Sequence, residues 1–396
     1  MKLIIRKDSV ILWIISVFLL YMLWFQYAVA ANGVVMPICA ALLGVYILKT
    51  IGSLKSYKYM VPIFLFFLCC LLSSLVSSDI SRGLTLLIDM LKYSIPMIAI
   101  YKYVGDDEKK YKLLLWVIAI ACMLVAGSTL IKGSVTETGA LTLGTMNPNV
   151  LSTYLMLGLI SNFLLLTRDI SPKGKILLMI FIVIEAVAQL AVASRRGILI
   201  FAFLCLIYVF LKNSLLPKKP STVAKRFVFA VVLLLGLIIL ADELLTRLSD
   251  MTFFQRFMGT AATIGGDRLR VRYQKVAWEL FLNNPLIGKG LGAVAKHAGA
   301  YAHSMYYETL ACTGLAGMLC IIFYFFRISV RCLKIKKINS SPLATANSLM
   351  ILWSVVAFLI SGITVVYIYD SVFYVLLAVF GVSVRIAEKK VYGGKT

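Results

Sequence analysis

The sequence predicts an all-α protein that crosses a membrane many times, and three observations support this prediction. Hydrophobic residues fill 61% of the 396 positions and charged residues only 14%, and the mean hydropathy is +0.94. Soluble domains contain about 45–50% apolar residues, so this composition is typical of membrane proteins. Apolar runs recur along the whole chain, and the basic residues gather between them, as in multi-pass proteins.

Twelve segments are long and apolar enough, or nearly so, to cross roughly 30 Å of hydrocarbon, which takes about 20 residues. The first follows the basic N-terminus without a cleavage site, so we expect it to remain as a membrane span. Three short runs, 33–48, 197–211 and 227–241, are expected to extend into their flanks. The expected spans are 9–31, 33–48, 59–77, 84–104, 113–131, 148–167, 176–194, 197–211, 227–241, 304–326, 345–361 and 365–384.

The distribution of positive charge predicts the orientation. With the N-terminus in the cytoplasm and the spans alternating, 27 of the 40 Lys and Arg residues fall inside, and both termini are cytoplasmic. The chain then divides into nine spans (1–241), an external loop (242–303), and three spans with a cytoplasmic tail (304–396). The net charge of +23 follows from this pattern, so we exclude nucleic-acid binding.

The external loop holds eight of the twelve basic residues that remain outside. Residues 267–284 predict an amphipathic helix, since apolar residues recur on one face at a spacing of 3.6 and Asn284-Pro285 ends the pattern. The apolar face consists of Leu269, Tyr273, Val276, Ala277 and Leu280. The glycines from Gly288 to Gly292 predict a tight turn under this helix, because no strand precedes them as a nucleotide-binding loop requires.

Arginines on the expected outer face oppose the orientation rule, which indicates an anionic ligand there. Arg195 and Arg196 lie between two spans, and guanidinium groups match phosphate oxygens in pairs. Arg268, Arg270 and Arg272 add to them on the external helix. The alternatives are arginines that reach the lipid headgroups and a solvated helix face.

His303 opens the tenth expected span and is one of two histidines. Its ordinary pKa near 6.5 lets it accept a proton from a hydroxyl, and neighbouring arginines favour the neutral form. A structural histidine at the membrane interface is the alternative. His297, in a Gly/Ala-rich loop, is expected to be structural. Tyr301, Tyr306 and Tyr307 either stack on sugar rings or belong to an interfacial aromatic belt, and Glu308 and Asp370 lie near the same face.

Ionisable residues inside the expected spans are the remaining candidates. Asp89 and Lys92 (i, i+3) predict an ion pair on one helix face, either structural or functional, and Glu185 and Gln189 are spaced i, i+4. None of the eight cysteines shows metal-ligand spacing with a histidine, so we expect no metal site.

Taken together, these motifs resemble the O-antigen ligase/polymerase family along essentially the whole chain. The sequence differs from the family pattern at Ser304, where the family often has asparagine, and in its doubled arginine. The matching residues are Gly144 with Asn147-Pro148-Asn149, Ser194-Arg195, Arg270, Asn284-Pro285-Leu286-x-Gly288-x-Gly290, Ala302-His303-Ser304-x-Tyr306-x-Glu308 and Gly314-Leu315-x-Gly317.

The resemblance implies a GT-C-like membrane glycosyltransferase of the cytoplasmic (inner) membrane that needs no metal or cofactor. Its donor would be a glycan on undecaprenyl pyrophosphate at the outer face, and its acceptor a sugar hydroxyl. An acceptor on a second lipid-linked repeat unit makes the protein a polymerase of O-antigen, capsule or exopolysaccharide, which we favour. An acceptor on lipid A-core makes it a lipopolysaccharide ligase. Membrane lipids and a chain-length regulator are further expected partners.

The expected mechanism inverts the anomeric carbon. Arg195 and Arg270 hold the pyrophosphate, and His303 takes the proton of the attacking hydroxyl. A transporter or flippase for the same lipid-linked glycan is the rival from another class, and a peptidoglycan-type polymerase fits the Asn-Pro-Leu segment less well. Further expected substrate contacts are Arg196, Arg268, Arg272, Tyr306, Glu308 and Asn147.

Overall fold

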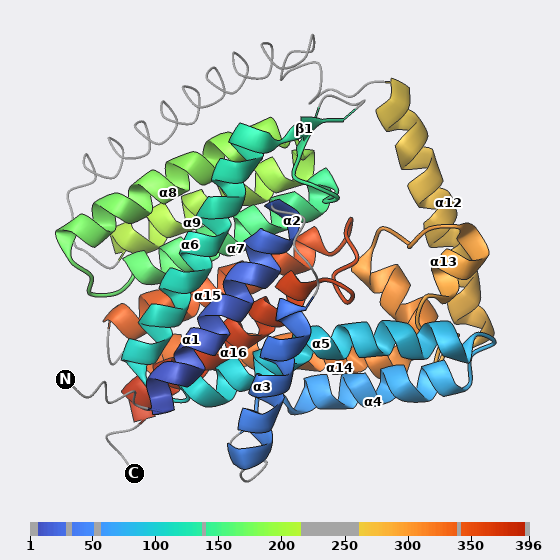
Figure 1. Ribbon diagram of the computed structural model, residues 1–396, viewed down its shortest axis with the longest axis horizontal. Coiled ribbons are helices and arrows are strands. Elements are labelled where there is room, and N and C mark those ends of the chain that lie inside the picture. Colours follow the sequence, from blue (N-terminus) through green and yellow to red (C-terminus); the bar gives the residue numbers. More distant parts are fainter. Residues whose placement is uncertain are drawn as a thin grey trace.

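The computed structural model describes residues 7–28, 34–50, 57–136, 140–214, 261–338 and 342–392 and confirms the all-α, polytopic class. Figure 1 shows helices throughout these ranges, and the described strands are the two-residue β1 (Ser134–Val135) and β2 (Leu141–Thr142), which pair antiparallel. Eight of the described helices are long and apolar enough to cross a membrane.

The expected spans coincide with helices, apart from 227–241, which lies outside the described residues. The first span consists of α1 (Lys7–Leu20), a π-helical stretch η1 (Tyr21–Phe25) and α2 (Gln26–Ala28). The next are α3 (Val35–Thr50), α4 (Val61–Leu75), α5 (Ile80–Val104), α6 (Glu108–Lys132), α7 (Pro148–Leu166), α8 (Pro172–Ala191) and α9 (Arg195–Ser214). The last are α14 (Met305–Ile338), α15 (Pro342–Ser361) and α16 (Ser371–Tyr392).

The predicted start of the last span, at residue 365, is wrong. Helix α16 begins at Ser371, because the Asp370 carboxylate accepts a hydrogen bond from the N–H of Val372 (2.9 Å), which is the contact of a capping residue. Nearly every side chain of α16 is buried, and the helix packs against α5, α6, α7, α14 and α15. It is therefore the central helix of the bundle.

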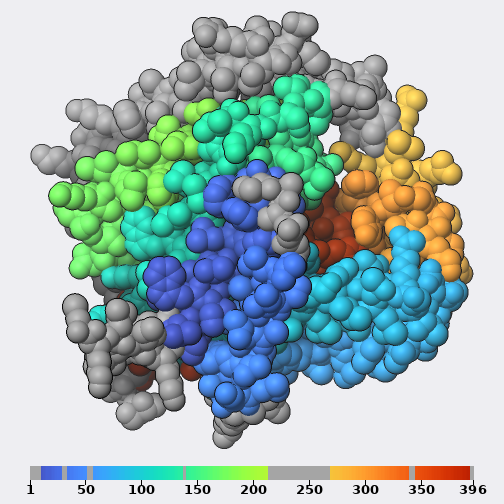
Figure 2. All heavy atoms as spheres, viewed as in Figure 1, coloured from blue at the N-terminus to red at the C-terminus, as the bar shows by residue number. Residues whose placement is uncertain are grey.

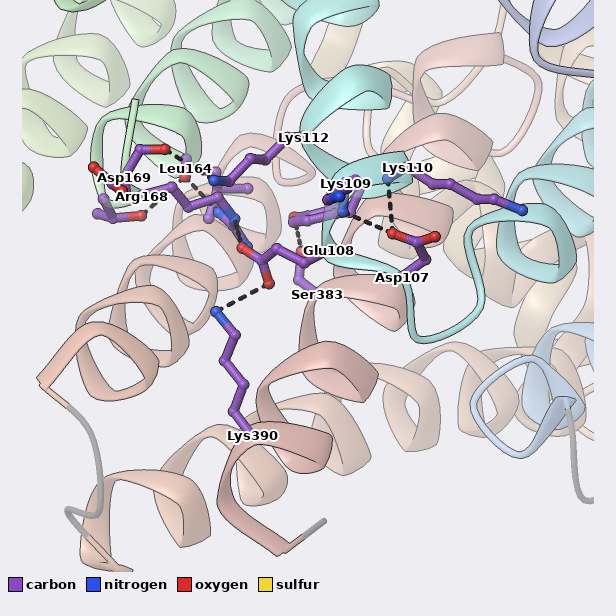
Figure 3. A network of polar contacts seen from close by, with 12 residues as sticks. Asp107, Glu108, Lys109, Lys110, Lys112, Leu164, Arg168, Asp169, Ser383 and Lys390 are labelled. Carbon is purple, nitrogen blue, oxygen red and sulfur yellow. Dashed lines mark hydrogen bonds and ion pairs between the residues drawn. The ribbon is translucent and has the colours of Figure 1, made fainter. Parts of the chain in front are cut away.

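Ion pairs connect neighbouring helices at one end of the bundle (Figure 3). The Glu108 carboxylate at the start of α6 accepts from Nε of Arg168 after α7 (3.0 Å) and pairs with Lys390 of α16 (3.0 Å). Further pairs at the same end join Arg385 to Asp106 (2.5 Å) and Lys58 to Glu388 (2.6 Å). Basic residues that the charge pattern assigns to one side of the membrane thus gather at one end.

Charged and polar residues within the spans have different surroundings. Lys92 donates to Asp89 (2.6 Å), which confirms the predicted ion pair, and both side chains are exposed on the surface of α5. Glu185 is completely buried and accepts a hydrogen bond from the amide of Asn162 (2.9 Å).

The helix predicted over 267–284 is confirmed as α12 (Ala261–Asn283), which is followed by the short α13 (Ala293–Ala298). Both lie on the right-hand side in Figure 1, next to the ends of α4, α5 and α14. Ala277 and Leu280 are buried as predicted, but Leu269 is 47% exposed. From Arg268 onward, where the structure describes its side chains, the buried ones of α12 all lie in its second half.

The helix α14 is interrupted at Gly314, whose φ of 63° and ψ of −164° are not helical. The N–H groups of Leu315 and Ala316 therefore do not bond within the helix. They donate to the carbonyls of Pro285 (2.8 Å) and Leu286 (3.1 Å) in the glycine-rich loop. A polar backbone group left unpaired at membrane depth would cost several kcal/mol, so the loop is required where the helix breaks.

The glycine-rich loop also donates hydrogen bonds to α14. The N–H groups of Lys289 and Gly290 donate to the carbonyls of Ala311 (2.9 Å) and Cys312 (3.0 Å), which the break leaves without helical partners. The two backbones touch at Gly288, where a Cβ would lie 2.4 Å from the backbone of Cys312. These contacts hold the glycine-rich loop against α14.

We expect Gly288→Ala to be far more destabilising than Gly299→Ala. Both glycines have positive φ (80° and 86°), but a Cβ at Gly299 meets nothing within 4 Å. Gly299→Ala should cost about 1 kcal/mol for the left-handed backbone alone, whereas overpacking at Gly288 adds about 1–3 kcal/mol. Thermal unfolding in detergent measures both, with Gly127→Ala, in open space, as the control. Equal losses at Gly288 and Gly299 would contradict the close backbone contact.

Candidate functional site

The turn before α7 and the start of α9 are joined directly, although they are far apart in the sequence. Gly144 has φ +57°, and a Cβ there would lie 2.6 Å from the carbonyl oxygen of Tyr27, so only glycine fits. The side chain of Asn149 accepts a hydrogen bond from the hydroxyl of Ser194 (3.0 Å). The same hydroxyl accepts from the N–H of Gly197 (3.3 Å) and so stabilises the first turn of α9.

The two adjacent arginines at this point have different surroundings. The guanidinium of Arg196 donates to the carbonyls of Asn149 (2.6 Å) and Ser361 (3.1 Å) and to the hydroxyl of Tyr367 (3.1 Å). Arg196 therefore ties α7 and α9 to the end of α15. Arg195 is partly exposed, and among the described residues it makes no hydrogen bond or ion pair.

His303 lies in a strained turn before α14. Its φ is +53°, a conformation that non-glycine residues rarely adopt. The imidazole stacks on the ring of Tyr273 of α12, with the ring centroids 5.9 Å apart and an interplanar angle of 30°. On its N-terminal side, the N–H of Ala302 donates to the buried carboxylate of Glu308 (2.8 Å). The turn is thus held between α12, through Tyr273, and α14, through Glu308.

Two causes lower the pKa of His303 below its ordinary value. Partial burial of the imidazole is the larger, and the positive charge of Arg270 is the second. Since both disfavour the protonated ring, the imidazole is neutral at pH 7 and able to accept a proton. Arg270 is itself partly buried, whereas Arg268 and Arg272 on the same helix are exposed.

The turn that contains His303 and the side chain of Arg196 both contact the residues at the end of α15. The N–H of Met305 donates to the carbonyl of Gly362 (2.8 Å), and Arg196 donates to the carbonyl of the preceding Ser361. Figure 2 shows a hollow on this side of the molecule, between α13 in orange and α5 in light blue, with atoms of the C-terminal segment in dark red at its base. The fold thereby brings residues of α9, α12 and the start of α14 to one end.

Three other residues that are expected to contact the substrate form hydrogen bonds within the protein. The side chain of Asn147 caps α7 by accepting from the N–H of Asn149 (2.9 Å), and the hydroxyl of Tyr306 donates to the carbonyl of Leu359 (2.6 Å). Glu308 is completely buried. Their contact with a substrate stays a prediction.

The connection between α15 and α16 contributes residues that the sequence did not single out. Tyr367 bonds to Arg196, and the hydroxyl of Tyr369 donates to Glu308 (3.3 Å). Burial raises the pKa of the neighbouring Asp370 to about 6. The only signal in the sequence is the run Tyr367-x-Tyr369-Asp370, which places polar groups at the start of an expected span.

Within the described ranges, no group of three or more His, Cys, Asp or Glu side chains is arranged to hold a metal ion.

Comparison with known proteins identifies the part of the chain that carries these groups. A family model described as O-antigen ligase matches residues 176–322, which run from α8 into α14 and include Arg195, Arg270 and His303. A search of curated proteins found no match to the chain.

We expect Arg196→Ala to lower the stability of the protein and Arg195→Ala to leave it nearly unchanged. Loss of three hydrogen bonds from a charged group should cost at least about 2 kcal/mol, whereas a partly exposed side chain without such bonds contributes within about 0.5 kcal/mol. Arg196→Lys should recover only part of the loss, because an ammonium cannot replace a guanidinium fork. Thermal unfolding in detergent compares the variants, and similar losses at both positions would contradict the assignment.

Proposed function

We propose that the protein is an inverting glycosyltransferase of the cytoplasmic membrane, because residues 176–322 match the family model described as O-antigen ligase. The family implies a membrane enzyme that ligates or polymerises glycans on lipid-linked substrates. The specific donor we propose is a glycan on undecaprenyl pyrophosphate, and the acceptor is a sugar hydroxyl at the outer face.

The observation that carries the proposal is that the charge of Arg270, together with partial burial, lowers the pKa of His303. A general base must be unprotonated at the working pH, and a pyrophosphate needs positive charge. Arg270 serves both purposes, because its charge lowers the pKa of His303 and can bind a phosphate. The exposed Arg268 and Arg272 make this end attractive to an anion.

In the proposed reaction, Arg195 and Arg270 bind the two phosphates of the donor. As the bond between the anomeric carbon and the phosphate oxygen breaks, negative charge grows on the pyrophosphate, and the guanidinium groups stabilise it. The acceptor hydroxyl attacks the opposite face of that carbon and gives its proton to His303. The products are an inverted glycosidic bond and the lipid pyrophosphate, and the proton then passes to water.

The orientation of the bundle supports a site at the outer face. The ion pairs of Glu108 and Glu388 lie at the end where basic residues are expected in the cytoplasm. Arg195 begins α9, and His303 lies just before α14, at the other end. Both termini are then cytoplasmic, and the lipid tail of the donor lies between helices.

We favour a polymerase of O-antigen, capsule or exopolysaccharide over a ligase. Purified protein given lipid-linked repeat units alone would form polymer in the first case. A ligase would act only when lipid A-core is added, and a flippase would move the glycan without forming a new bond. A chain-length regulator is a proposed partner of the polymerase.

His303→Ala should reduce glycan transfer by about 10²–10⁴-fold, the usual contribution of a general base. Arg270→Lys keeps the charge but loses the bidentate fork, so we expect at least about a tenfold loss. Both are measured with lipid-linked repeat units and normalised to the amount of folded, membrane-inserted protein. Near-normal transfer by the His303 variant would remove the base from the mechanism.

The pH dependence of kcat/KM should follow the lowered pKa of His303. Because the folded protein disfavours the charged ring, the base stays neutral below pH 6.5, and the acid limb of the profile should have its midpoint below that value. Arg270→Gln removes the smaller of the two causes and should move the midpoint upward. Lys275→Gln removes an exposed charge from the same helix and should not move it. An acid limb centred above 6.5 would contradict the assignment of His303.

A further inference from the structure

The left-handed backbone conformation of His303 has to be stabilised by contacts with other residues. A residue with a side chain costs about 1–2 kcal/mol in the left-handed conformation, and such a conformation persists only where surrounding contacts fix it. Two hydrogen bonds flank the residue, from the N–H of Ala302 to Glu308 and from the N–H of Met305 to Gly362 (both 2.8 Å). The first depends on a side chain and can therefore be tested.

Glu308 does not act as an ordinary helix cap. In a capping box, the glutamate at the third position of a helix accepts from the N–H of the capping residue. Glu308 is the fourth residue of α14, and Ser304 directly precedes this helix. Instead, the Glu308 carboxylate reaches back to Ala302, two residues further. The bond therefore closes a ring of chain around His303.

The second oxygen of Glu308 is fixed by Tyr369. The N–H of Gly292, at the start of α13, donates to the hydroxyl oxygen of Tyr369 (3.2 Å). That hydroxyl in turn donates its proton to Glu308 (3.3 Å). The tyrosine ring also packs against Tyr301, with the ring centroids 5.1 Å apart. Three segments of chain thus meet at one buried carboxylate.

We propose that Glu308 and Tyr369 are positioning residues, which hold the imidazole of His303 at the place and angle needed to accept the proton of the acceptor hydroxyl. The proposal rests on the role of His303 in the proposed function. Tyr369 belongs to the connection between α15 and α16, so this connection, together with the glycine-rich loop, fixes the geometry of the base.

Tyr369→Phe tests the proposal, because it removes one hydroxyl and keeps the ring. We expect kcat for glycan transfer to fall about tenfold, which is 1.4 kcal/mol, with the KM for the lipid-linked donor unchanged. In a His303→Ala background the same change should produce no further loss. The matched control is Tyr324→Phe, which removes the hydroxyl of a buried tyrosine bonded to the carbonyl of Leu377 (2.5 Å) and should leave kcat unchanged.

A second readout does not depend on activity. The chain has only two histidines, so NMR of protein labelled at histidine separates His303 from His297, whose ring bonds to the carbonyl of Ala293 (2.9 Å). Loosening the turn exposes His303 to water, so in Tyr369→Phe its titration midpoint should rise toward 6.5. Glu308→Ala should do the same, and Glu308→Gln, which keeps an acceptor for Ala302, should do so less.

The two readouts separate the possible failures. If the wild-type protein transfers no glycan, the proposed function fails, and the NMR titration still tests whether Tyr369 positions His303. Wild-type titration of His303 in the Tyr369→Phe protein would overturn the inference, as would an equal loss of kcat with and without His303. If Tyr369→Phe does not fold, the two Glu308 variants give the same comparison.

Discussion

The break in α14 is the constraint on which the rest of the site depends. A membrane helix cannot leave its backbone groups unpaired, and Gly314 leaves four without helical partners. The loop with Gly288 supplies partners for all four, and it does so only because glycines allow the two backbones to touch. Docking this loop fixes α13 behind it and α12 before it. The strained turn of His303 and the proposed phosphate ligand Arg270 are positioned as a result.

The adjacent arginines illustrate how one short motif serves two purposes. Arg196 donates three hydrogen bonds, to Asn149, Ser361 and Tyr367, and so builds the scaffold. Arg195, one residue earlier, faces a different direction on the first turn of α9 and keeps its guanidinium free of described partners. A helix start suits this division, since successive residues of a helix project about 100° apart.

Composition and hydropathy were sufficient to predict the apolar helices of the described residues and the helix α12, because both are properties of contiguous sequence. They failed at α16, where Val365 and Ile368 look like the start of a span and the capping role of Asp370 is visible only in its contact with Val372. Nor could spacing show that Tyr369 reaches Glu308, 61 residues away. The sequence indicated His303 and Arg270 as candidates through their chemistry, but their proximity is a property of the folded chain.

The central position of α16 bears on how the protein can move. Transporters that alternate between two openings are built from two repeats or bundles that rock against each other around a fixed site. In the described helices, α16 contacts partners from both the first and the last parts of the chain, and its end is pinned through Lys390 and Arg385 to the start of α6. Within the described helices, α16 therefore ties the first and the last parts of the chain into one packed core.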